Sequence, residues 1–270
     1  QVTGDWQRQR GDGNAPGADQ NSTGVVVGGD VGVGQGWRVG GAFGYTDARL
    51  RPDQRSATAK TQSYTATIYG GKSFAAGAGA INVLAGAAYS WHDIDTRRQV
   101  RYGSLDQNLT ASYSGNTTQL FAEAGYSLAV TPAVTLEPFI GLSWSDLRVR
   151  GFSESGGSAA LSGSAQSQDT TSTLAGLRGQ WAPAQTDLVL RGMLGWRHAY
   201  GSLRPTQTLA FDQGASFSVA GAPIARDAAR VELGADLVVV RNMTAGLRYA
   251  GEFGGGNRQH AGSVDVRWRF

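Results

Sequence analysis

Histidine can act as an acid, a base or a metal ligand near neutral pH, so the three histidines of this chain are the first candidates for chemistry. Of these, only His92 lies close in sequence to acidic residues, Asp93 and Asp95. A histidine next to carboxylates has the chemistry of a general base. On a β-strand, however, His92 and Asp93 point to opposite faces and cannot pair directly. The sequence contains no Gly-x-Ser-x-Gly nucleophile motif, no cysteine and no spacing of histidines and carboxylates typical of a metal site. We therefore expect no catalytic residues, no metal and no other cofactor in this chain.

A glycine-rich stretch over residues 24–36 partly resembles a nucleotide-binding fingerprint. That fingerprint needs a strand followed by a helix, and no helical period of apolar residues follows here. Glycine within strands also makes room for large aromatic side chains of adjacent strands, or lets a strand bend. We interpret the 40 glycines of the chain in this second way.

The remaining candidate chemistry is the pairing of arginines with carboxylates. Of the 24 basic residues, all but Lys60 and Lys72 are arginines, the cation suited to fixed, bidentate pairing. The arginines are scattered among acidic residues and the net charge is only +3, whereas nucleic-acid binding needs a clustered basic face. We expect no nucleic-acid partner.

The elements that position these charges are amphipathic strands. The final eight residues put Val264, Val266, Trp268 and Phe270 on one face of a strand and the polar residues between them on the other. No run of about 18 apolar residues exists, which excludes a transmembrane helix. Mean hydropathy is −0.27, normal for a barrel whose inner wall is wet. The pattern predicts an all-β fold: a transmembrane, antiparallel, up-and-down β-barrel over residues 1–270 as a single domain.

Twelve strands fit the chain, because a Gly-rich, aromatic pattern recurs about every fifty residues and each period holds two long alternating segments. Their expected ranges are 2–13, 22–34, 37–48, 61–74, 80–96, 116–130, 135–151, 169–182, 186–202, 227–240, 243–254 and 258–270. Tight turns follow alternate strands. The other connections, 49–60, 97–115, 152–168 and 203–226, are longer, and the last could form a hairpin of its own. Short turns on one side and long loops on the other are typical of outer-membrane barrels, with periplasmic turns and extracellular loops.

The alternation assigns a face to each charged and aromatic side chain. The charges expected to line the lumen are Arg38, Glu123, Glu137, Arg178, Arg191, Glu232, Asp236, Arg248, Glu252, Asp265, Arg267 and Arg269. An arginine facing lipid near the midplane costs about 2–4 kcal/mol, which favours the lumen. These charges either form a functional wall or only fill the interior. Two groups of tryptophans are expected at the two membrane interfaces. Trp37, Trp181 and Trp268 lie close to short turns, whereas Trp91, Trp144 and Trp196 each lie about nine to eleven residues from a short turn, which is the length of a membrane-spanning strand. Tryptophan is also simply common in β-structure.

Several segments together resemble the C-terminal translocator of a type V autotransporter. They are the opening strand with Trp6, Thr23–Asp30, Trp37–Tyr45, Leu136–Phe139 and the terminal Val266–Phe270. The resemblance implies a barrel of about twelve strands in the outer membrane of a Gram-negative bacterium. It also implies export of an N-terminal passenger domain to the cell surface, so the partners would be the chain's own passenger, the barrel assembly machinery, periplasmic chaperones, and outer-membrane lipid and lipopolysaccharide. We expect the barrel to be a monomer.

The resemblance gives the last residue a role and leaves two questions open. Phe270 resembles the signal that the assembly machinery reads on nascent barrels, and it also suits an interfacial anchor. The family usually carries a helix inside the pore just before the first strand, so whether this pore is plugged stays open. Residues 1–20 lack the basic start and apolar core of a signal peptide, so we expect an upstream segment. The alternative is a stand-alone small porin or surface adhesin.

Overall fold

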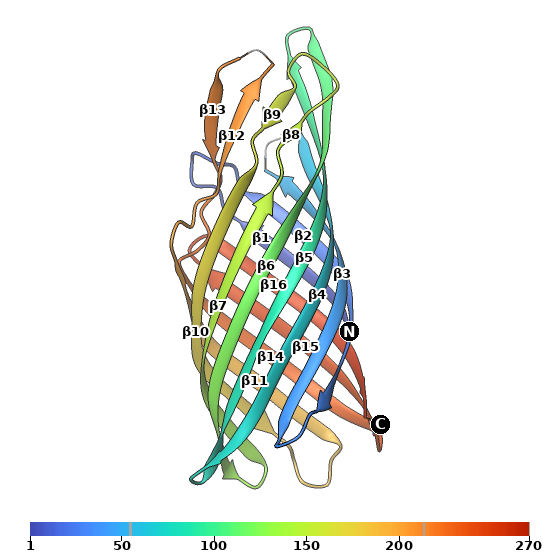
Figure 1. The fold of residues 1–270 in the computed structure, drawn as a ribbon, viewed down its shortest axis with the longest axis vertical. Helices are drawn as coiled ribbons and strands as arrows, with labels where there is room; N and C mark the ends of the chain where they lie inside the picture. Colours follow the sequence, from blue (N-terminus) through green and yellow to red (C-terminus); the bar gives the residue numbers. More distant parts are fainter. Residues whose placement is uncertain (54–55, 213, 270) are drawn as a thin grey trace.

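Twelve strands close into an antiparallel barrel in the computed structural model, which describes residues 1–53, 56–212 and 214–269 (Figure 1). In chain order the barrel strands are β1 (Val2–Gln9), β2 (Ala18–Gly32), β3 (Trp37–Pro52), β4 (Ala57–Ala76), β5 (Gly79–Tyr102), β6 (Leu105–Thr131), β7 (Val134–Val149), β10 (Gln166–Trp181), β11 (Leu188–Tyr200), β14 (Asp227–Val240), β15 (Met243–Gly254) and β16 (Asn257–Trp268). The predicted fold class and strand number are confirmed. Within the described ranges, no helix is long and apolar enough to span a membrane.

The barrel closes where the first strand pairs with the last. β1 pairs with β16 in antiparallel register from Val2↔Val264 to Gln9↔Asn257, and every other barrel strand pairs with its neighbours along the chain. Closure matters physically because it leaves no sheet edge with unpaired N–H and C=O groups.

The apolar side chains point away from the barrel axis. Ile140, Leu194 and Val266 are 58%, 64% and 62% exposed, although residues of these types are normally buried in a protein dissolved in water. An exposed apolar belt of this extent needs an apolar surrounding. The strand alternation that exposes these residues turns the intervening polar side chains inward.

Several strand boundaries differ from the sequence-based expectation. The predicted loop 97–115 is wrong: β5 continues to Tyr102, β6 starts at Leu105, and a two-residue turn joins them. The predicted loop 49–60 is likewise mostly strand. The extension of β5 is rich in arginine and shows no apolar alternation, whereas the start of β6 does alternate, with Leu105, Leu109 and Tyr113 on one face. By contrast, β1 ends at Gln9 rather than residue 13, because Gly13 has φ +88° and Pro16 offers no N–H to a ladder.

A second sheet rises from the upper end of the barrel in Figure 1. It has four strands in the order β13 (Ser216–Ala220), β12 (Thr206–Phe211), β9 (Leu161–Gly163) and β8 (Phe152–Ser153). β12 and β13 confirm the hairpin expected within 203–226. Phe152 stacks on Tyr113 of β6 with ring centroids 4.8 Å apart, and Leu109 of β6 is fully buried. This is where the chain builds a conventional core.

Candidate functional site

The interior of the barrel holds a cavity of about 640 Å³. Its lining comes from β7, β10, β11, β14, β15 and β16, together with Gln1 and Thr3 at the start of the chain. The charged lining residues are Glu137, Arg178, Arg191, Glu232, Arg248 and Arg267. All six were expected to face the lumen.

Asp236 on β14 is the centre of the first charged cluster, here called the Asp236 cluster. Its carboxylate accepts hydrogen bonds from Arg191 at 2.7 Å, Arg248 at 3.0 Å and Arg267 at 2.6 Å. Asp265 on β16 joins the cluster through Arg267 at 2.7 Å and Arg248 at 3.4 Å. The side chain of Asp236 is only 5% exposed, so the arginines themselves cover it from water.

Glycine at position 246 makes the Asp236 cluster possible. A Cβ on Gly246 would lie 2.6 Å from one oxygen of Asp265 and 2.8 Å from one oxygen of Asp236. Any side chain there would push these carboxylates apart. The strand β15 therefore carries its glycine where two neighbouring strands bring acidic groups together.

Arg178 on β10 is the centre of a second cluster, the Arg178 cluster, on the part of the wall next to β11. It donates to both carboxylate oxygens of Glu123 at 2.5 Å and to Glu137 at 3.3 Å. The guanidinium lies 3.8 Å from the ring centroid of Phe139, a cation–π contact. Asn82 donates to Glu137 at 2.7 Å, so both clusters are tied across several strands.

The other expected lumen charges form smaller pairs or none. Glu252 pairs with Arg197 at 2.7 Å, and Glu232 pairs with Arg230 at 2.8 Å. Arg38 pairs with Asp30 near the lower turns. Arg269 follows β16, and within the described residues it has no ion pair.

Some members of the wall were not singled out from the sequence. Arg230 shares the inward parity of Glu232, so alternation could have found it, whereas the alternation with Arg191 does place Arg197 on the lumen face. Asn82, Gln180 and Phe139 contact the charged side chains, and the sequence of a single strand does not predict these contacts between strands. The Ser63 hydroxyl lies 2.8 Å from Nδ1 of His92, and the Thr117 hydroxyl lies 2.8 Å from Nε2. His92 is therefore half-buried between two hydroxyls.

The comparisons with known proteins agree with this architecture. The family model "Autotransporter beta-domain" matches residues 1–250. An extracellular serine protease of Serratia marcescens is 36% identical over 272 aligned positions, which cover all of this chain and 26% of that protein. The chain belongs to the autotransporter beta-domain family. It spans about a quarter of the length of the curated relatives that it matches.

Solved autotransporter barrels have the same fold. The translocator domain of NalP from Neisseria meningitidis matches with a TM-score of 0.76 at 22% identity, covering 100% of this chain and 86% of that one. The transport unit of AIDA-I from Escherichia coli matches with a TM-score of 0.64 at 15% identity, covering 100% and 89%. As an autotransporter beta-domain, the chain is a translocator barrel of type V secretion and resides in the Gram-negative outer membrane.

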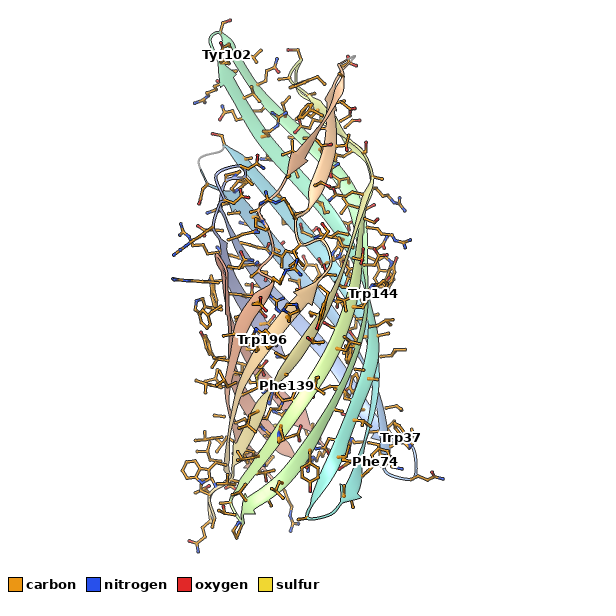
Figure 2. All side chains as sticks on the ribbon, turned by 90° about the vertical axis from the view of Figure 1, so that its left-hand side faces the viewer. Trp37, Phe74, Tyr102, Phe139, Trp144 and Trp196 are labelled. Atoms are coloured by element: carbon orange, nitrogen blue, oxygen red, sulfur yellow. The ribbon has the colours of Figure 1, made fainter. Side chains whose placement is uncertain are left out.

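The tryptophans of this autotransporter barrel lie at two heights. Figure 2 places Trp144 and Trp196 about midway along the molecule, and Trp37 near its lower end beside Phe74. The exposed fractions of five of the expected interfacial side chains are 42% for Trp37, 49% for Trp91, 49% for Trp181, 57% for Trp196 and 64% for Trp268. Trp144 is only partly exposed. Phe270 lies outside the described residues.

Proposed function

We propose that this barrel moves its own passenger polypeptide to the cell surface through the lumen, with the Asp236 and Arg178 clusters as the fixed wall. The observation that carries the proposal is the position of Gln1. Gln1 lines the lumen cavity, and its amino group donates to the carbonyl of Val26 at 2.8 Å on the adjoining strand. A polypeptide joined to that amino group would leave the barrel wall at the border of the lumen cavity, within reach of the lumen.

The dimensions of the barrel limit what can pass. Twelve strands enclose a lumen wider than that of filled eight-stranded barrels and narrower than that of porins. One helix or one or two extended segments fit such a space, whereas a folded domain does not. The passenger must therefore cross unfolded and fold outside.

The charges of the wall suit this task. Nearly every inward arginine is held by a carboxylate, so the wall offers few free charges that could bind a polar polypeptide tightly. The bonds between strands also keep the cylinder rigid while the chain slides past. Within this proposal the 270 residues act as one monomeric translocator unit without catalytic residues, and any activity like that of the protease relatives belongs to the passenger.

The proposal includes partners outside the barrel. We expect periplasmic chaperones and the barrel assembly machinery to insert the chain, with Phe270 as the residue that the machinery reads. Lipid, including lipopolysaccharide, would contact the apolar belt between the two rows of tryptophans.

A disulfide trap tests the route. Because the 270 residues contain no native cysteine, an introduced thiol has no competing thiol within the barrel. Ser263→Cys places a thiol on the cavity wall, and Val264→Cys, its neighbour, places one on the outer face, where Val264 is 55% exposed. Each variant carries a passenger with one cysteine a few residues upstream of Gln1. We expect oxidation to cross-link the Ser263→Cys variant and stop surface display, measured by protease accessibility on intact cells. Reduction should restore display.

Val264→Cys should neither cross-link nor stop display. If Ser263→Cys displays its passenger normally under oxidation and forms no cross-link, the polypeptide does not pass through this lumen. Single-channel conductance of the barrel without a passenger addresses the alternative of a porin: a large, steady conductance with no effect of an attached passenger would favour it.

A further inference from the structure

Two arginines face each other on the outer surface where the barrel closes. Arg8 of β1 is the register partner of Arg258 of β16. Both share the outward parity of Trp6 and Val264, which are 56% and 55% exposed. Like charges directly opposite each other on adjacent strands destabilise a sheet. A pair at the junction of first and last strands therefore needs a compensating anion.

The protein supplies little of that compensation. The nearest carboxylate, Asp19 on β2, is 3.8 Å from Arg8, and both of these side chains are at least half exposed. Within the residues that the structure describes, Arg258 has no ion pair. Arg10 brings a third basic residue to this end of the two strands, since its backbone N–H donates to the Gly256 carbonyl at 2.9 Å beside the β15–β16 turn.

A similar pair elsewhere on the barrel shows what compensation looks like. Arg49 of β3 is the register partner of Lys60 of β4, also on the outer face. There Asp47 lies 3.1 Å from the Lys60 ammonium and 3.8 Å from Arg49, so one carboxylate serves both cations. The arginines at the β1–β16 junction lack such a shared carboxylate.

Aromatic side chains lie directly below the two arginines. Trp6 is the register partner of His260. The Tyr249 hydroxyl lies 2.8 Å from Nδ1 of His260, and the Phe253 ring meets the His260 ring edge-on at a centroid distance of 5.4 Å. Aromatic bodies with polar tips are typical of the boundary between acyl chains and head groups.

We propose that Arg8 and Arg258 bind the phosphorylated head group of an outer-leaflet lipid, whose acyl chains run down over Trp6 and Phe253. The planar fork of arginine matches phosphate oxygens in pairs. One phosphate between the two guanidiniums would replace their repulsion with a bridge across the β1–β16 junction. That junction includes β1, which at eight residues is the shortest of the twelve barrel strands. The inference concerns the barrel alone and does not depend on the route of the passenger.

The test is lipid binding by the purified 270-residue chain in detergent, followed by native mass spectrometry with bisphosphorylated lipid A as the probe. We expect the double variant Arg8→Gln/Arg258→Gln to bind lipid A about tenfold more weakly, the loss expected for one charge-assisted interaction at a partly exposed site. The matched control is Arg49→Gln/Lys60→Gln, which removes the same charge on the same face. It should bind lipid A as the wild type does.

Two further probes identify the ligand. Dephosphorylated lipid A should bind the wild type about as weakly as phosphorylated lipid A binds the double variant, and inorganic phosphate should not compete at millimolar concentration. The proposal fails if the double variant retains wild-type binding, or if the control loses as much. Full competition by inorganic phosphate would also overturn it, because the site would then select the free ion. Heat-modifiable migration on gels confirms folding, and Arg8→Lys/Arg258→Lys, which keeps the charge, should fall between wild type and the glutamine variant.

Discussion

Replacing Asp236 with asparagine should destabilise the barrel more than any other single change of one lumen charge to its amide. The substitution keeps the shape of the side chain but removes the charge that three arginines share, at 2.7, 3.0 and 2.6 Å. Among the described residues, Asp265 is then the one carboxylate left in ion-pair contact with Arg248 and Arg267, while Arg191 keeps the side-chain carbonyl of Gln180 at 2.8 Å. The perturbation is therefore electrostatic and leaves the packing unchanged.

The magnitude follows from the bonds lost and from the water that replaces them. Each charge-assisted hydrogen bond contributes about 1.5–3 kcal/mol, and removing one partner of a buried ion pair costs about 3–5 kcal/mol. The arginine side chains are 35–46% exposed to the wet lumen, so water takes over part of their solvation. We expect Asp236→Asn to lower the free energy of unfolding by about 2–4 kcal/mol.

Urea unfolding of the refolded barrel in lipid vesicles, followed by tryptophan fluorescence and gel migration, measures this difference. Asp30→Asn is the matched control, because in the part of the chain that the structure describes Asp30 pairs with Arg38 alone, whose side chain is 68% exposed. That change should cost less than about 1 kcal/mol. If Asp236→Asn is no less stable than Asp30→Asn, the Asp236 cluster does not hold the wall together, and its charges only fill the interior.

Two further predictions concern the upper loops and the glycines. Hydrogen bonds from the Ala15 backbone N–H and from Arg204 lower the pKa of Asp12 from 3.8 to about 2, so the attachment of loop 201–226 to this turn should persist above pH 3.8 and be lost as the pH falls towards 2. Hydrogen exchange of loop 201–226 should show that profile, and Arg204→Gln should remove the protection at neutral pH; unchanged protection in the variant would contradict the role of this pair. Gly86→Ala should cost about 1–3 kcal/mol in urea unfolding, because the added Cβ would lie 2.4 Å from Phe121 and 2.6 Å from the Ile68 carbonyl. Gly29→Ala, whose Cβ would meet nothing within 4 Å, is the control, and equal stability of the two variants would refute the packing argument.

Individual strands show which features of the barrel can be predicted from the sequence and which cannot. Along β11, the alternation of Leu190, Leu194 and Trp196 with Arg191 and Arg197 predicts which side chains face lipid and which face the lumen. This works because the two-residue period of a strand is a local property of the backbone. The glycines that make room for carboxylates, such as Gly246, have no comparable signal. Their reason lies in the side chains of neighbouring strands.

Local periodicity thus determined by itself that the chain forms an antiparallel barrel, how many strands it has and which face of each strand is apolar. Only the tertiary structure decided which arginine meets which carboxylate, as when Arg178 meets Glu123 at a separation of 55 residues. Those partners depend on the stagger of strands around a closed barrel, which is a property of the whole sheet. The arginine-rich extension of β5 and the pairing of β9 with β12 were also decided by the tertiary structure, because neither a polar strand nor a pairing between distant segments leaves an apolar alternation in the sequence.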